Sequence, residues 1–564
     1  MTEREKDELA AQILAVIRAR SEPSGAADPQ EILERACRLA EAPPTGVPPV
    51  PAPANPHRPA PDMRRVDHYL SAAGALLLAV YFLRLTRAAL HVYFTPDDLM
   101  NLYRSWIFSG GLLLKANFLF FLNSDFGRPM GSVWYRLIFD LAGFHPFWFH
   151  ACDLAILTAN IWLTYAVARR LARSREIALL TALFMAFQYR LEPLYFDTGY
   201  IYDVLCYFFL FAALSLYLRA RDRSRAQRAP REGVVGTAAR EGNLRPWEWT
   251  TLFVLYICAL NSKEIAVMLP AFLGLYELLY HPPRGWQPAA LRHWLAREGR
   301  AELLAGGVTA VFVIGRSIGP QSLTHNAVYQ PSFTWTQFLL TSRHFAGDFF
   351  GMQDWPAWAV LLLWTALAVI ACATRSRVLG YAWLFLMLSP LPIAFILPRG
   401  TAQYYVCLFG WALYASVLLV KLSSLLTRGV RAPEWWVARA RGAALFCIAM
   451  LIFYAAYKPL GYGEVTSASL EAPENRNTVA QLHAAAPAIR RGSRLLFLND
   501  PIPPDWYNLL FIVQLSYGDP SLRVARAKEM KQPLTEQEIA SYDYVFDYRE
   551  GRFFTLRQPG STAN

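Results

Sequence analysis

Apolar segments dominate the chain and recur about eleven times, most of them near the twenty or so residues that a helix needs to cross a hydrocarbon layer, with the third and fifth shorter. The expected spans are roughly 68–90, 147–168, 177–189, 198–218, 248–262, 265–280, 302–318, 356–374, 378–396, 403–422 and 441–457. Such a pattern is typical of an all-α polytopic membrane protein, because a helix satisfies its own backbone groups in lipid. The transmembrane domain is expected over residues 67–458, with a long external loop over 92–146.

The first 66 residues have a different pattern. They are polar and end in a Pro/Ala-rich stretch from Pro43 to Pro61, without a cleavable signal peptide before the first span. A stretch of that composition is extended and does not pack into a hydrophobic core. We expect residues 1–66 to be a largely disordered cytoplasmic tail.

Residues 459–564 alternate as strands and helices of a soluble domain do. The segments 494–498 and 542–548 predict buried strands, and 506–517 has helical spacing. A Glu550-Gly551 turn would pair residues 552–556 with the second of these strands. This predicts a small α/β domain outside the membrane, for which a purely structural or docking role is the simplest interpretation.

The charge pattern sets the orientation. The chain has a net charge of +12 but only 17% charged residues, against 54% hydrophobic ones. Its arginines cluster after every second span, for example at 169–175 and 219–228. This is the positive-inside pattern, so the net charge is a topology signal and indicates no nucleic-acid partner. The N-terminus is expected in the cytoplasm and the C-terminal domain outside. The Arg/Ala/Pro-rich composition favours a bacterial inner membrane, with that domain in the periplasm.

Two adjacent carboxylates, Asp97 and Asp98, follow the first span. Charge at a membrane surface is costly unless it is hydrated, paired or used. Repulsion between neighbouring carboxylates raises the pKa of one of them, which suits a general base or a metal ligand. The alternative is a solvated pair that caps the next helix behind Pro96. The pair alone leaves both interpretations open.

Other polar side chains lie at the outward ends of other spans. They are Arg128, His145, His150, Glu192, Asp197, Asp203, Lys263, Glu264, Arg399, Tyr404 and Tyr405. Each has an ordinary explanation, such as snorkelling, interfacial packing or helix capping. Together they place acids, cations and tyrosines on one face of the membrane. Cations there could hold a lipid phosphate by charge-assisted hydrogen bonds while an acid deprotonates a hydroxyl.

Three stretches of the chain carry a resemblance. They are Arg128-Pro129 through Gly143-Phe144-His145-Pro146-Phe147-Trp148-Phe149-His150 to Ala168-Arg169-Arg170-Leu171, then Ser262-Lys263-Glu264-Ile265-Ala266-Val267-Met268-Leu269-Pro270, and Arg399 with Tyr404-Tyr405. With the acid pair after the first span, they resemble, in order and topology over residues 68–425, the GT-C superfamily of glycosyltransferases. The likeness is closer to the branch that includes the protein O-mannosyltransferases and the transmembrane-and-tetratricopeptide proteins.

The resemblance implies transfer of a sugar from a polyprenyl- or dolichyl-phosphate donor, with inversion at the anomeric carbon. By position, Asp97 corresponds to the family's general base and Asp98 to its partner, and the reverse order stays open. The resemblance makes Lys263 and Arg399 the first phosphate ligands, with Arg128 as a further one. Glu264 would orient Lys263 or the acceptor. The other candidate substrate contacts, for which packing is an equal alternative, are His145, His150, Tyr404 and Tyr405.

The sequence departs from that branch in two ways. It has no tetratricopeptide repeats, and its Arg399–Tyr404 spacing is longer than a contiguous Arg-Tyr, which puts the role of Arg399 in doubt. No cofactor is required by the residues themselves. Mg²⁺ or Mn²⁺ stays open because some family members use a metal, although two acids alone are few ligands for either ion.

The expected partners are a polyprenyl-phosphate sugar donor, membrane lipids, and an acceptor that is a protein, a lipid or a glycan. Two other classes compete with this enzyme. A lipid-linked polysaccharide polymerase or ligase would also bind lipid phosphates outside, but has no special need for the acid pair. A secondary transporter would place polar residues in mid-membrane and show internal repeats, which this sequence lacks.

Overall fold

The structure, a computed structural model, describes residues 61–122, 127–228, 244–318, 322, 330–350, 355–427, 434–461, 467–504 and 506–559. The chain divides into two compact units, Met1–Leu70 and Ser71–Asn564. Of the first unit only the start of one helix is described, so the predicted tail, residues 1–66, lies almost wholly outside the described residues. The second unit holds all the features below.

Helices make up most of this unit. The elements up to residue 280 are α3 (Pro61–Thr86), η1 (Arg87–His91), α4 (Pro96–Ile107), α5 (Gly110–Phe118), α6 (Pro129–Ala142), α7 (Pro146–Ala172), α8 (Arg175–Ala186), η2 (Tyr189–Leu191), α9 (Pro193–Phe196), η3 (Thr198–Tyr200), α10 (Ile201–Arg228), α11 (Pro246–Ser262), η4 (Glu264–Met268) and α12 (Leu269–Tyr280). The following ones are α13 (Pro288–Arg297), α14 (Arg300–Ser317), α15 (Trp335–Phe350), α16 (Ala357–Ala373), α17 (Arg377–Leu388), η7 (Leu391–Ile393), η8 (Thr401–Tyr404), α18 (Tyr405–Thr427) and α19 (Glu434–Gly461). Elements marked η are short 3-10 helices.

Four helical stretches among the described residues are long and apolar enough to cross a membrane: Ala72–His91, Pro146–Ala172, Thr198–Ser224 and Ala402–Thr427. Further apolar helices, such as α16, are shorter. The protein is therefore a mostly helical integral membrane protein, as the hydrophobic pattern predicts. The count of eleven spans stays a prediction, because helices such as α8, with 12 residues, are short for a full crossing.

The interior of the bundle is aromatic. Helix α10 packs against α7 and α11, and α18 packs against α8 and α17. The rings of Tyr207 and Phe211 stack at a centroid distance of 3.9 Å, and Phe211 meets Phe409 of α18 edge to face at 4.8 Å. A Cβ on Gly410 would lie 3.0 Å from the backbone nitrogen of Leu386. A small residue at this point therefore lets α17 and α18 approach closely.

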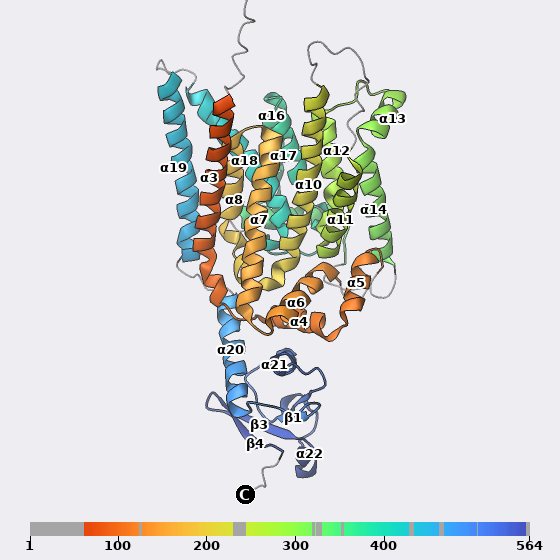
Figure 1. Cartoon of the computed structure of the whole chain (residues 1–564), viewed down its shortest axis with the longest axis vertical. Helices are drawn as coiled ribbons and strands as arrows, with labels where there is room; N and C mark the ends of the chain where they lie inside the picture. The colour runs from red at the N-terminus through yellow and green to blue at the C-terminus, as the bar shows by residue number, and fades with distance from the viewer. Residues whose placement is uncertain are drawn as a thin grey trace, which may run out of the picture. The chain divides into compact units, whose positions relative to one another are not determined.

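Three shorter helices of the predicted external loop, α4, α5 and α6, lie at one end of the bundle, where α6 packs on α7, α10 and α11 and α5 packs on α11 (Figure 1). Helix α6 packs on α10 so tightly that a Cβ on Gly131 would lie 2.2 Å from the Tyr202 ring. The predicted external loop is thus largely helical, with Trp106 in α4 and Trp134 in α6. The predicted break at Lys263 and Glu264 is also present, between α11 and α12.

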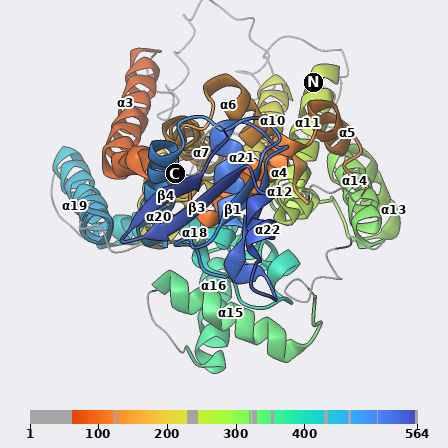
Figure 2. The same cartoon turned by 90° about the horizontal axis from the view of Figure 1, so that it is seen from below.

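The C-terminal segment contains α20 (Ser467–Ala485), β1 (Arg494–Phe497), α21 (Asn508–Tyr517), β2 (Arg523–Arg526), η9 (Ala527–Glu529), α22 (Glu536–Ala540), β3 (Tyr544–Arg549) and β4 (Arg552–Arg557). The strand order is β2-β1-β3-β4, with β1 parallel to β2 and β3, and β4 antiparallel to β3. Figure 2 shows β1, β3 and β4 side by side.

The two residues of the predicted hairpin turn, Glu550 and Gly551, have φ angles of 50° and 76°. Positive φ at both central positions is what a type I′ hairpin requires. This confirms the predicted turn. The pattern missed the edge strand β2. The division of the chain at residue 458 stays a prediction.

Candidate active site where α4 meets α10

Helix α4 begins with a capping box that uses one of the two predicted acids. The Thr95 side chain accepts from the backbone N–H of Asp98, and Asp98 Oδ2 accepts from the backbone N–H of Thr95 at 2.9 Å. The Asp98 side chain is fully buried and also accepts from the hydroxyls of Thr198, at 2.5 Å, and Tyr135, at 3.3 Å. Burial raises the pKa of Asp98, although these hydrogen bonds oppose the rise. Its lone pairs are committed to the fold.

Asp97 differs from Asp98 in its exposure and in its hydrogen bonding. Consecutive helical residues point about 100° apart, and Asp97 is exposed. Its carboxylate accepts no hydrogen bond from any residue in the described ranges. Its Cβ lies 3.3 Å from the position that a Cβ on Gly199 would occupy, so α4 and the turn before α10 touch at this point. Asp97 is the acid that a substrate can reach.

Two more carboxylates gather behind this pair. Asp197 is 9% exposed, accepts from the Gly199 N–H at 2.8 Å, and accepts from the Thr95 hydroxyl at 3.3 Å. Burial, and then the charge of Asp98, raise the pKa of Asp197 well above its ordinary value. Asp153 of α7 is 1% exposed, and its Oδ1 lacks a hydrogen-bond partner among the described residues. Sequence reasoning missed Asp153, although an acid in mid-span is itself a signal.

An ion pair between α6 and η4 provides the cationic part of the site. Arg128 donates from Nε and Nη2 to the two carboxylate oxygens of Glu264, at 3.2 and 3.0 Å, and its guanidinium lies over the ring of Tyr202. Burial, the largest single cause, raises the pKa of Glu264, but the charge and hydrogen bonds of Arg128, a backbone hydrogen bond and the Lys263 charge together bring the pKa below its ordinary value. Arg316 of α14 donates to the Gly127 carbonyl at 3.2 Å. Two predicted site residues, Arg128 and Glu264, are thus brought together.

Lys263 lies next to this pair but is not exposed. It is 4% exposed and forms a buried salt bridge with Asp203 in the first turn of α10. In this arrangement its ammonium faces Asp203 rather than a lipid phosphate. The neighbouring Tyr202 donates to Asn101 Oδ1 at 3.0 Å, which joins α10 to α4.

The two predicted histidines lie in different surroundings. His145 is exposed and forms the N-cap position of α7. His150 is 1% exposed and lies against the backbone of Val92. Burial favours the packing role for His150, and His145 alone has surface that a ligand could contact.

The third predicted segment forms a cluster of its own. Arg399 lies near Tyr404, whose ring stacks on Phe345 of α15 at 4.1 Å and is 1% exposed. Tyr405 is also buried and stacks on Tyr207 of α10 at 4.4 Å. Tyr404 thus contacts α15, and Tyr405 contacts α10 and Asn160 of α7, and none of these contacts is with the acids of α4. Both tyrosines are therefore packing residues in this structure.

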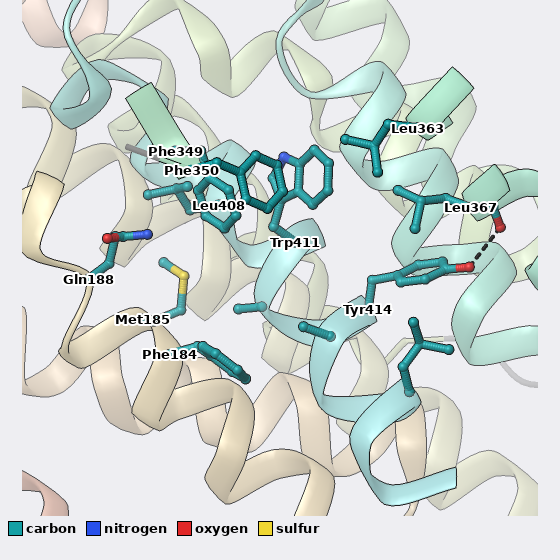
Figure 3. Close-up of a pocket in the computed structure, with 13 residues that line it drawn as sticks. Phe184, Met185, Gln188, Phe349, Phe350, Leu363, Leu367, Leu408, Trp411 and Tyr414 are labelled. Carbon is teal, nitrogen blue, oxygen red and sulfur yellow. Dashed lines mark hydrogen bonds between the residues drawn. The ribbon is translucent and has the colours of Figure 1, made fainter. Parts of the chain in front are cut away.

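An apolar cavity of about 310 Å³ begins about one helical turn beyond the Phe345–Tyr404 pair. Phe349, Trp411 and Leu408 contribute to its wall, and Gln188 is the polar exception (Figure 3). The Tyr414 hydroxyl points away to the Leu367 carbonyl, to which it donates at 2.6 Å. A cavity with this lining suits a hydrocarbon chain and no polar group.

The residues present do not fit a metal site. Among the described residues, no three His, Cys, Asp or Glu side chains converge in an arrangement that could hold a metal ion. Asp98 already accepts three hydrogen bonds, which leaves Asp97 without a co-ligand from its own pair. The role proposed for Asp97 requires no metal ion.

No family model matches the chain, and no curated protein matches it. Several solved structures are similar to it at low identity. One is an oligosaccharyltransferase of Archaeoglobus fulgidus in complex with Zn and sulfate, with 12% identity over 80% of this chain and a TM-score of 0.40. This chain spans 62% of that protein's length.

Two others are structures of ArnT from Cupriavidus metallidurans. The form bound to undecaprenyl phosphate has 13% identity, covers 88% of this chain and 98% of that one, and has a TM-score of 0.36. The apo form has 14% identity, covers 82% and 87%, and has a TM-score of 0.37. At these scores no residue role is transferred.

Proposed function

We propose that the protein is a membrane glycosyltransferase of the GT-C type. It transfers a sugar from a polyprenyl-phosphate donor to an acceptor hydroxyl at the outer face of the membrane, with inversion. The observation that carries the proposal is the difference between the two acids of α4. Asp98 caps the helix and is saturated, whereas Asp97 is exposed beside it and free of hydrogen bonds from the described residues.

Asp97 is the general base in this proposal. A single displacement at the anomeric carbon needs one carboxylate to take the proton of the attacking hydroxyl, while the lipid phosphate leaves from the opposite side of the sugar. The phosphate carries its own negative charge and gains from nearby cations. Arg128 is the cation that we assign to the lipid phosphate, because its guanidinium is half-buried and held in place by Glu264.

The donor's isoprenoid chain has a chemically suitable place in the apolar cavity between α8, α15 and α18. Arg399 lies near the end of that cavity at which Tyr404 and Phe345 stack. A role for Arg399 in holding the donor therefore stays part of the proposal. The sugar and the acceptor class stay open.

The test uses purified wild type, Asp97→Asn and Asp98→Asn with radiolabelled polyprenyl-phosphate sugars and a host membrane extract as acceptor. Loss of a general base lowers transfer by about 10²- to 10⁴-fold. We expect this loss in Asp97→Asn with donor binding retained, and a smaller loss in Asp98→Asn. Full activity of Asp97→Asn would remove the base assignment. A wild type that neither transfers sugar nor binds donor would favour the polymerase, ligase or transporter alternatives.

A further inference from the structure

The C-terminal segment contacts the helix that carries the acids. Both α20 and α21 pack on α4. The clearest contact is that of Asn475 in α20, whose Nδ2 donates to the backbone carbonyl of Phe94 at 2.9 Å. Asn475 is 4% exposed and Phe94 is 0% exposed, so this hydrogen bond is shielded from water.

The carbonyl that Asn475 binds sits at a sensitive point of the chain. Phe94 directly precedes Thr95, the N-cap of α4, and its ring is held by Phe144 at 4.8 Å and Phe149 at 5.3 Å. A buried carbonyl left without a donor destabilises the folded state. Asn475 therefore satisfies the backbone two residues before Pro96 and three before Asp97.

A second contact holds the other end of the helix. The ring of Tyr103 in α4 packs on Phe511 of α21 at a centroid distance of 4.7 Å. Six residues separate Tyr103 from Asp97, which is about 9 Å along a helix. Contacts at both ends leave α4 little freedom to rotate or slide with respect to α20 and α21.

We propose that the C-terminal domain is a working part of the active site, and that Asn475 is a positioning residue which fixes the N-terminus of α4 and hence the direction of Asp97. This inference rests on the proposed function. It replaces the simpler interpretation of the domain as a separate docking module. Asn475 touches no reacting group, so its effect passes through the α4 backbone. Small misplacements of a reacting group can reduce rates by about 10²-fold.

The experiment compares Asn475→Ala and Asn475→Gln with Thr478→Val in the full-length protein. Thr478 lies one turn further on α20, is 3% exposed, and donates to the Glu474 carbonyl within its own helix. Its substitution therefore removes a partly buried hydrogen bond of the same helix but none to α4. Three quantities are measured: kcat and KM for the lipid donor, the thermal unfolding midpoint, and amide hydrogen exchange of the peptide over residues 94–107.

We expect Asn475→Ala to lower kcat about tenfold or more, with KM for the donor within about twofold and faster exchange at the start of α4. Asn475→Gln keeps the donating amide and should recover part of kcat. Thr478→Val should change neither kcat nor the exchange of α4. Equal losses in Asn475→Ala and Thr478→Val, in step with the unfolding midpoint, would overturn the positioning role.

The exchange measurement separates this inference from the proposed function. Unchanged exchange in Asn475→Ala, with an active wild type, would overturn the inference alone. A wild type that transfers no sugar would overturn the proposed function and, with it, the catalytic meaning of the contact. Faster exchange of α4 would then still establish the mechanical coupling.

Discussion

Helix α10 connects two clusters of buried charge that differ in one respect. At its first turn Asp203 pairs with Lys263, near an acid that is exposed, Asp97. Toward its other end Arg221 pairs with both Glu277 and Glu298. In that second cluster Glu277 and Glu298 share the cation of Arg221, and neither acid is exposed as Asp97 is.

The second cluster is closed by a hydroxyl as well. Tyr217 donates to Glu277 at 2.8 Å and to Glu302 at 3.0 Å. A buried network of this kind fixes helices relative to one another, and of its acids Glu302 keeps one carboxylate oxygen, Oε2, without a hydrogen-bond partner among the described residues. The number of buried charges is therefore a poor indicator of where a functional site lies. What distinguishes the first cluster is the neighbouring carboxylate of Asp97, which is exposed and accepts no hydrogen bond from the described residues.

The largest expected effect is on the stability that the second cluster provides. Arg221→Met leaves Glu277, which is fully buried, without its cation. Breaking one partner of a buried pair costs about 3–5 kcal/mol. We expect a large fall in the thermal unfolding midpoint in detergent, with the specific activity of the folded fraction unchanged. The matched control is Arg221→Met with Glu277→Gln, which should recover part of the loss. A full loss of activity without a stability change would place the cluster in the active site.

The second prediction concerns the close contact in front of Asp97. A Cβ on Gly199 would lie 2.9 Å from Asp197 Oδ1 and 3.3 Å from Asp97 Cβ. Gly199→Ala should therefore push the acids apart and destabilise the protein by about 1–3 kcal/mol, as overpacking does. Sugar transfer should fall with little change in donor binding.

The control for this prediction is Gly306→Ala in α14, where a Cβ meets nothing within 4 Å. In a helix interior this change is neutral or stabilising. If Gly199→Ala and Gly306→Ala behaved alike, the contact between the turn before α10 and α4 would not be tight.

The elements that depend only on neighbouring residues could be predicted from the sequence. Pro96 followed by two acids marks a helix start, and α4 begins there. The Glu550-Gly551 pair marks a hairpin, and β3 and β4 pair around it. The edge strand β2, Arg523–Arg526, was missed because four residues with an arginine at each end show no strand pattern.

The site depends on contacts that no local pattern contains. Lys263 reads as an interfacial cation, but its partner Asp203 comes from 60 residues earlier in the chain and buries it. The different states of Asp97 and Asp98 follow from Tyr135 and Thr198, which the fold brings in from α6 and η3. The order of motifs therefore predicted which segments carry the candidate residues, whereas packing decided which side chains are available. The roles assigned to them stay predictions.

A smaller effect is expected from the Arg128–Glu264 pair. The pKa of Glu264 lies below its ordinary value of 4.5, so its ionised form is favoured in the folded state. Its contribution is then complete above that value and is lost as the pH falls through the lower, folded value. The pair is partly exposed, so about 1 kcal/mol or less is expected.

Glu264→Gln measures this contribution. The unfolding midpoints of wild type and variant should differ by a constant amount at neutral pH and converge under acid conditions. A difference that grew as the pH fell would mean that Glu264 is not the ionised partner of Arg128.

The smallest stability effect is expected at Asp97, the proposed general base. Asp97→Asn changes an exposed side chain that accepts no hydrogen bond from the described residues, so the free energy of unfolding should move by about 0.5 kcal/mol or less. Asp98→Asn, one position on, replaces an acceptor-only group that serves Thr95, Thr198 and Tyr135, and should cost about 1–2 kcal/mol. Thermal unfolding of both variants in one detergent measures the contrast. If Asp97→Asn were the less stable of the two, Asp97 would be the structural acid and the assignment of the base would pass to Asp98. The reverse order, with activity lost in the stable variant, would mean that the acid with unspent bonding capacity is the one that performs the chemistry.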